Sequence, residues 1–306
     1  MTWLETMSLD LQIFGFRALW SPYYFLFLLA IAIAYYLITG PMREKFGAED
    51  QPTVRQQIGF YIGLILLYIV KGSPIDLLSH IMLTAHMTQM AIYLLVVPIL
   101  IIKGIPVWIW KKVVYAPIIR PIFKLLTQPI VIVLVFNLAF SIYHMPAVFD
   151  FTKSSPIAHS SIAIALFILA ICMWWVIYCP IKELDRLNPL LKIVYMVAHG
   201  ALITPACALL IFTGTPQFAA YTSEGAWIQA MALCVPADVL NGISGDLSGP
   251  EMFSPLSTMD DQQLGAIIMQ TVIQFVYAYV IGKVFFAWFK KGSGKIDPIP
   301  TSHISS

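Results

Sequence analysis

Four of the six histidines fall where several helices of a membrane bundle would end together. His80 and His86 lie near the start of one long apolar stretch, His144 ends the next stretch, and His159 begins the one after it. Imidazole suits copper and zinc, and ionisable groups inside a bilayer are costly and usually mark function. The positions of these histidines therefore predict a functional site, with a metal ion as its expected ligand.

Methionines on the same stretch indicate which metal to expect. Met82, His86 and Met90 are spaced i, i+4, i+8, so they form one stripe on a helix, and His80 and Met87 share a second face. Thioether and imidazole together select Cu(I) over magnesium, calcium or manganese. The candidate metal ligands are His86, Met90, His80, Met87, His144 and His159.

Three polar residues are expected to support this site. Gln89 lies beside the first stripe, and Asp260 and Asp261 precede the last apolar stretch at the same level. A carboxylate there could fix the tautomer of a ligating histidine or form part of a docking surface. Methionine in a membrane helix more often packs than binds metal, and a lone histidine near a helix end often only forms a hydrogen bond. Four histidines at one level favour the functional interpretation.

The composition shows what kind of elements must position these side chains. Of the 306 residues, 59% are hydrophobic and only 11% are charged. A soluble domain carries about 25% charged residues, so too few charges remain to cover a surface in water. The net charge of +2, without a basic stripe, gives no reason to expect a nucleic-acid partner. The sequence predicts an all-α integral membrane protein.

Seven apolar stretches predict a bundle of seven transmembrane helices in a single domain over residues 1–306. The expected spans are 22–40, 56–71, 77–103, 129–145, 157–181, 190–212 and 264–289.

Two connections are more than simple linkers. Segment 105–126 mixes tryptophans, prolines and basic residues, which is typical of an interfacial segment on an anionic membrane face. Loop 213–263 is long and acidic, without a basic residue, and loops of that length are usually functional.

The distribution of basic residues predicts the orientation in the membrane. With seven spans, fifteen of the 18 Lys and Arg residues fall in one set of alternating connections and three in the other. By the positive-inside rule, the N-terminus is expected outside and the C-terminus in the cytoplasm. This orientation places the histidines near the outer face.

No enzyme motif is present in the sequence. Signatures of hydrolases, zinc proteases, nucleotide-binding loops and covalent haem attachment are all missing, so an enzyme is not expected. Ligation of haem by two histidines, as in an electron-transfer protein, stays an alternative.

Two strings resemble the CtaG family of bacterial cytochrome c oxidase assembly factors. One is TAHMTQM at 84–90, followed by Pro98 and the Gly-Ile-Pro of 104–106; the other is DQQLGAIIM at 261–269. Many members have a second histidine where this chain has Met90, and a second glycine where it has Ala266. The change to methionine keeps a donor that can bind copper.

The resemblance implies a role in maturing a heme-copper oxidase, with the oxidase subunits as partners besides membrane lipid. It leads to the hypothesis that Cu(I) is held transiently by His86 and Met90, with help from other outer histidines, and is then delivered to the oxidase. A homo-oligomer is left open.

Two alternatives belong to other classes of protein. A transporter for copper or another small solute would need polar residues at several depths, and Asn137, His199, Gln270 and Gln274 form only a thin ladder. A metal-free scaffold for oxidase subunits would depend on the acidic loop rather than on His86 or Met90.

Overall fold

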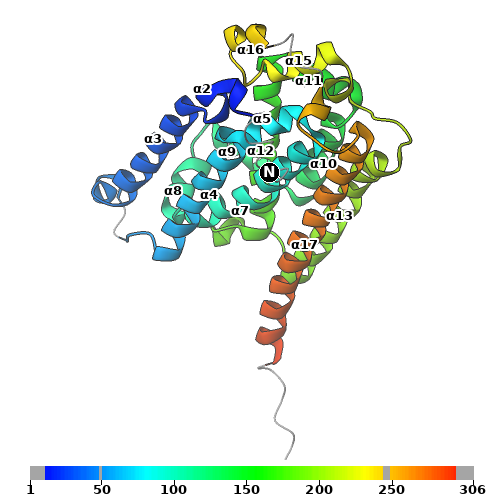
Figure 1. Ribbon diagram of the computed structural model, residues 1–306. Coiled ribbons are helices and arrows are strands. Elements are labelled where there is room, and N and C mark those ends of the chain that lie inside the picture. Colours follow the sequence, from blue (N-terminus) through cyan, green and yellow to red (C-terminus); the bar gives the residue numbers. More distant parts are fainter. Residues whose placement is uncertain (1–10, 48–49, 244–248, 294–306) are drawn as a thin grey trace, which may run out of the picture.

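The computed structural model describes residues 11–47, 50–243 and 249–293; the two ends of the predicted domain, 1–10 and 294–306, lie outside them. Within the described residues every regular element is a helix, which confirms the all-α prediction (Figure 1). The long helices are α3 (Pro22–Thr39), α4 (Val54–Gly72), α12 (Pro156–Tyr178), α13 (Pro189–Phe212) and α17 (Thr258–Ser293).

Six helical segments in the described part are long and apolar enough to cross a membrane. They are the five long helices, the first counted with the short turns before it, and the run Leu83–Gly104. A seventh results if α9 (Ile119–Leu126) and α10 (Pro129–Tyr143), which meet at an angle of 83°, count as one bent span. These segments make the chain a multi-pass membrane protein.

Local sequence signals explain where the long helices begin. Thr53 and Gln56 form a reciprocal capping box at the start of α4, and the Asn188 side chain accepts a hydrogen bond from the Leu191 amide at the start of α13. Helices α3, α10, α12 and α13 carry proline in their first turn, where the missing N–H costs nothing.

The predicted continuous helix over 77–103 is wrong. The structure has α5 (Pro74–Ile81), then Met82 in extended conformation, then α6 (Leu83–Ala91), a π-helical turn η3 (Ile92–Val96) and α7 (Val97–Gly104). The break has a distant cause: the Asp261 carboxylate accepts hydrogen bonds from the amides of Leu83 and Thr84, at 2.6 and 3.1 Å. It thereby caps α6 as a separate helix and leaves His80 on α5.

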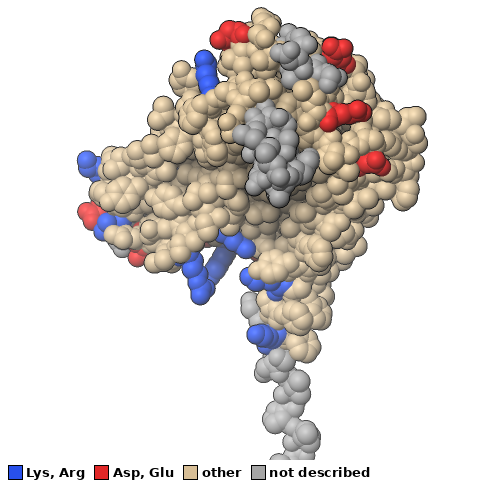
Figure 2. All heavy atoms as spheres, in the orientation of Figure 1, with Lys and Arg blue, Asp and Glu red and all other residues tan. Residues whose placement is uncertain are grey.

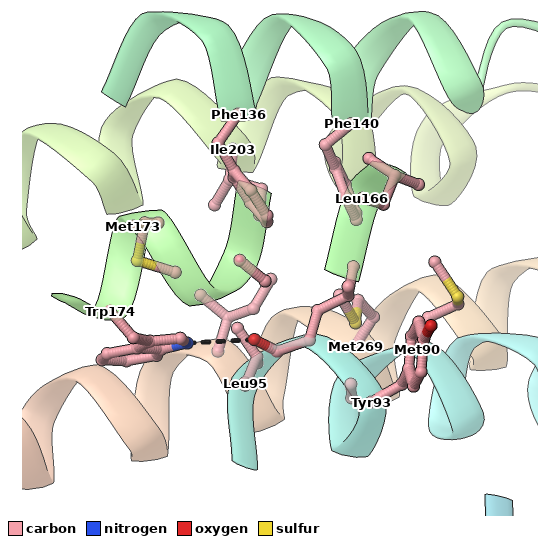
Figure 3. Packing of buried hydrophobic residues seen from close by; sticks show 14 of the residues in the cluster. Met90, Tyr93, Leu95, Phe136, Phe140, Leu166, Met173, Trp174, Ile203 and Met269 are labelled. Carbon is pink, nitrogen blue, oxygen red and sulfur yellow. Dashed lines mark hydrogen bonds between the residues drawn. The ribbon is translucent and has the colours of Figure 1, made fainter. Parts of the chain in front are cut away.

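Pro98 explains the distortion farther along this run. Proline has no N–H, so the carbonyl four residues earlier, on Leu94, loses its helical donor. The indole Nε1 of Trp174 on α12 donates to that oxygen at 2.9 Å, as the dashed line in Figure 3 shows. Trp174 is fully buried in the main hydrophobic core, where Met173, Phe136 and Phe140 also lie.

Replacing Trp174 by Phe is expected to lower the free energy of unfolding by about 1–3 kcal/mol, because the buried Leu94 carbonyl would lose its only side-chain donor found among the described residues. Thermal denaturation in detergent measures the effect. Trp288→Phe, at an exposed position on α17, is the matched control and is expected to change little. Equal effects of the two substitutions would contradict this explanation.

The long acidic loop folds into a cap over α5. It contains α14 (Ala219–Thr222), α15 (Glu224–Met231), α16 (Ala237–Ile243) and η5 (Pro250–Met252). A second hydrophobic cluster joins this cap to α5 and to the N-terminal turn, with Phe14, Leu77, Trp227 and Phe253 among its buried members. In Figure 1 the cap lies at the top of the molecule, together with α2 (Gly15–Leu19) and α11 (Pro146–Ser154).

Charged side chains gather at the two ends of the bundle. Figure 2 shows most acidic side chains at the end covered by the cap and most basic ones at the opposite end. We call these the acidic end, with Asp150, Glu224 and Asp238, and the basic end, with Lys111 and Lys290. The predicted interfacial segment 105–126 folds as two short helices, α8 (Val107–Val114) and α9, and bonds to the 182–188 connection through Lys111–Glu183 and Arg186–Lys124 contacts.

Candidate functional site

The histidines of the predicted layer form two pairs at the acidic end. His80 on α5 and His159 on α12 have ring centres 5.1 Å apart, and His86 on α6 and His144 at the end of α10 have ring centres 6.4 Å apart. All four histidines are at least partly buried. The fold therefore brings together, from four different helices, the imidazoles that the sequence placed at one level.

Tyr143 and Phe149 pack around the pair formed by His86 and His144. The Tyr143 hydroxyl lies 3.5 Å from Nε2 of His86, and the Phe149 ring stands edge-on to the same imidazole at 5.1 Å. His86 is only 1% exposed and His144 only 6%. A ligand between these rings would be shielded from water by aromatic side chains.

Each of the four imidazoles has a buried ring nitrogen without a hydrogen-bond partner among the described residues: Nε2 of His80, Nδ1 of His86, Nε2 of His144 and Nδ1 of His159. Buried polar atoms are normally hydrogen-bonded, so such a group of exceptions calls for a ligand or bound water. His144 is the clearest case. Its Nδ1 donates to the Phe140 carbonyl at 2.8 Å, which leaves the lone pair of Nε2 free to bind a metal.

A buried lysine contacts the other pair. Lys153 on α11 is only 1% exposed, and its Nζ lies 3.2 Å from Nδ1 of His80 and donates to the Ser79 carbonyl at 3.1 Å. Burial lowers the pKa of Lys153 to about 7, because water no longer stabilises the ammonium form. The Lys153 ammonium also faces the Phe149 ring at 5.4 Å, so it lies between the two histidine pairs.

A polar cluster continues from the histidines toward α4. The Lys71 ammonium lies 3.3 Å from Asp76, whose carboxylate also accepts a hydrogen bond of 2.7 Å from Gln89. Gln89 in turn accepts from Lys71 and donates to the Val70 carbonyl. Predicted as a support of the site, Gln89 thus holds α6 to α4 and fixes the position of Asp76.

The Asp76 carboxylate also contacts a cysteine of the cap. The Cys234 thiol, in the turn after α15, donates to Asp76 Oδ2 at 3.4 Å. Ligand atoms of Asp76, His80 and Cys234 all lie within 4.8 Å of one another. This grouping brings a thiol, an imidazole and a carboxylate to one place.

The other predicted site residues have different surroundings. Met87 and Met90 are buried in the main hydrophobic core, where Figure 3 shows Met90 beside Tyr93. Asp261 is buried and bonded to the start of α6, whereas Asp260 is exposed and accepts a hydrogen bond of 2.6 Å from the Ser257 hydroxyl of its own turn. Within the described part of the chain, no hydrogen bond or ion pair joins these four residues to the histidine rings.

Asp261 has a structural role that its neighbour lacks. Asp261→Ala should lower the free energy of unfolding by about 1–3 kcal/mol, because two amides at the start of α6 lose their acceptor. Asp260→Ala, one residue earlier, removes only a local contact and should have little effect. Thermal denaturation of both variants in the same detergent measures the two changes in stability. A similar loss in both would show that the helix break does not depend on Asp261.

The site predicted from the sequence did not include Asp76, Lys71, Lys153, Tyr143 or Cys234. Lys71 and Lys153 appeared only as charges in outer connections, although both turn inward. The sequence did contain a signal for the two lysines. Lys71 lies just before the stretch that carries His80, and Lys153 lies between His144 and His159.

The helices and the buried histidines together define a multi-pass membrane protein with a polar site at one end of its bundle. The profile of the family described as cytochrome c oxidase caa3 assembly factor (Caa3_CtaG) matches residues 33–291. The chain belongs to this family, as its resemblance in sequence had indicated. No curated protein and no solved structure matches it.

Proposed function

We propose that this assembly factor holds Cu(I) transiently between the histidine pairs of the acidic end and delivers it to the cytochrome c oxidase during assembly. The observation that supports the proposal most directly is the set of four unpartnered ring nitrogens in one buried region. Neutral imidazole nitrogens suit Cu(I), which prefers soft to borderline donors over water and carboxylate. Copper is the cargo here, not a resident cofactor.

The ligands best placed for this role are His86 and His144, with His80 and His159 beside them. This assignment modifies the sequence-based hypothesis, because Met90 is a member of the main hydrophobic core. An incomplete coordination shell suits a transfer site, since an incoming ligand must be able to exchange for one already bound.

The distribution of charge supports an orientation with the acidic end outside. Basic side chains gather at the opposite end (Figure 2), and the two lysines of the acidic end, Lys71 and Lys153, turn into the cluster. By the positive-inside rule the basic end then faces the cytoplasm of a bacterial plasma membrane. Copper would be handed over on the outer side, to an oxidase subunit whose copper centre faces the same side.

Anaerobic titration of the purified full chain with Cu(I), against a chromogenic chelator, tests the proposal. We expect His86→Ala combined with His144→Ala to weaken copper binding by about 100-fold or more, since both imidazoles of one pair are lost. His199→Ala is the matched control: His199 is equally buried and also has an unpartnered Nε2, but its ring neighbours among the described residues are Phe136, Tyr195 and Tyr277 rather than a second imidazole. Unchanged affinity in the double variant would refute the site.

A further inference from the structure

Cys234 gives the acidic end a donor of a different chemical kind. It comes from the cap, whereas its neighbours Asp76 and His80 come from α5. His80 is completely buried, and its Nε2 has no partner among the described residues. The thiol is therefore one member of a built cluster that includes an unsatisfied imidazole.

The spacing of this cluster fits a metal ion held by two soft donors. Metal–sulfur and metal–nitrogen bonds of about 2.3 and 2.0 Å, as in zinc sites, let an ion in line between the two donors span about 4.3 Å. The ligand atoms of Cys234, His80 and Asp76 lie within 4.8 Å of one another. Small side-chain movements would therefore complete such a site.

The charges around the cluster favour a monovalent ion. Lys71 contacts Asp76 at 3.3 Å, and Lys153 contacts His80 at 3.2 Å. If Cu⁺ replaces the thiol proton, one positive charge replaces another and the total charge is unchanged. A divalent ion would leave an additional positive charge beside the two lysine side chains in a poorly solvated region, which is unfavourable.

Accessibility distinguishes Cys234 from the histidine pair described above. Cys234 is half-buried in a turn of the cap, whereas His86 and His144 are buried beneath aromatic side chains. An ion arriving from the acidic end therefore reaches the thiol before it reaches those imidazoles. The ring of His159 lies next to that of His80, so the cysteine cluster adjoins a second imidazole.

We propose that Cys234 and His80, with Asp76 as proton acceptor, form an entry site that takes a soft monovalent metal ion from outside and passes it to the deeper histidines. This inference rests on the proposed function. On loading, the S–H bond of Cys234 breaks, a Cu–S bond forms, and the Asp76 carboxylate, which already accepts the thiol hydrogen bond, passes the proton on to water, so that the charge of the cluster is unchanged. Copper stays Cu(I), and no electron is transferred.

Protection of the thiol from alkylation tests the entry site in the intact protein. The purified full chain is treated with iodoacetamide under anaerobic conditions, alone or with Cu(I), Ag(I) or Zn(II), and the modified peptides are quantified by mass spectrometry. We expect Cu(I) and Ag(I) to slow alkylation of Cys234 by about tenfold, because a metal-bound thiolate is a poor nucleophile. Zn(II) at the same concentration should protect much less. Cys179, half-buried at the basic end, is the internal control and should not be protected.

The variant Cys234→Ser separates metal binding from structure, because a serine hydroxyl can still donate to Asp76 but does not replace a thiolate as a soft ligand. It should retain the thermal stability of the parent and bind less copper. If Cu(I) leaves the alkylation of Cys234 unchanged while binding still depends on His86 and His144, the entry site is wrong and the proposed function stands. If, in addition, copper binding does not depend on His86 or His144, the entry site and the proposed function are both wrong. Equal protection by Zn(II) would overturn the preference for a monovalent ion.

Discussion

Cells that carry His144→Ala are expected to assemble little active caa3-type oxidase when copper is scarce, and to recover when copper is added. The Nδ1 of His144 bonds to the Phe140 carbonyl, which leaves the Nε2 lone pair free to bind copper. Replacing the imidazole by a methyl group therefore removes the copper ligand of the pair whose orientation is already fixed. We expect oxidase activity in membranes from copper-limited cells to fall about tenfold or more, as is common when a metal-ligand set is disturbed.

The recovery with copper distinguishes this account from its rivals. His199→Ala in the same strain is the control for general loss of a buried histidine, and it should retain assembly if the protein still folds. A metal-free scaffold predicts normal assembly in the His144 variant at low copper, provided the variant is present in the membrane. A transporter predicts uptake of copper into vesicles that contain only this protein, which our account does not.

Gly104→Ala is expected to disrupt the packing of α7 against α4. A methyl group on Gly104 would lie 2.6 Å from the backbone nitrogen of Phe60 and 2.8 Å from its Cα, and backbone atoms cannot move aside as a flexible side chain can. Overpacking of this kind costs about 1–3 kcal/mol, and more where the backbone must move. The Tyr35 hydroxyl, which donates to the Gly104 carbonyl at 3.0 Å, would shift as well.

Gly282→Ala on α17 is the matched control for this prediction. The same added methyl group would meet no atom within 4 Å there, and alanine is a better helix former than glycine. Thermal denaturation should therefore show a lower melting temperature for Gly104→Ala and an unchanged or higher one for Gly282→Ala. A melting temperature equal to that of the parent for Gly104→Ala would contradict the close helix contact.

Much of the fold could be predicted from the sequence, because length and hydropathy alone define the spanning helices. The exception is the run from 77 to 103, where hydropathy is continuous but the backbone is not. The helix breaks at Met82 because Asp261 caps the next helix from 178 residues away. The prediction of seven spans also depended on α10, which has only 15 residues and reaches spanning length only together with α9.

The candidate site could be predicted in part. The four histidines group together because each lies in the part of its predicted span that faces the same side of the membrane, which a count along the chain reveals. Their pairing as His80 with His159 and His86 with His144 depends on the order of helices around the bundle, which periodicity does not contain. Cys234 could not be placed for a similar reason, since the fold of the cap decides what the thiol contacts.

The methionine stripe illustrates a limit of reasoning from helical spacing. Met82 and Met90 are separated by two turns around His86, as a copper-binding stripe would require. Met82, however, is the residue at which the helix breaks, and Met90 packs into the apolar core. Spacing on one helix identifies residues that share a face, but the neighbouring helices decide whether that face is packed or open.

Transfer of copper to the oxidase tests the central proposal most directly. The full chain, loaded with Cu(I) under anaerobic conditions and freed of excess metal, is mixed with oxidase purified from copper-starved cells, and the copper in each separated protein is measured. We expect the oxidase to gain copper and activity from the parent protein, and to gain neither from the variant that lacks the His86 and His144 imidazoles. If the loaded chain keeps its copper, or if the oxidase acquires copper equally well with the variant, the chain does not deliver copper through this site.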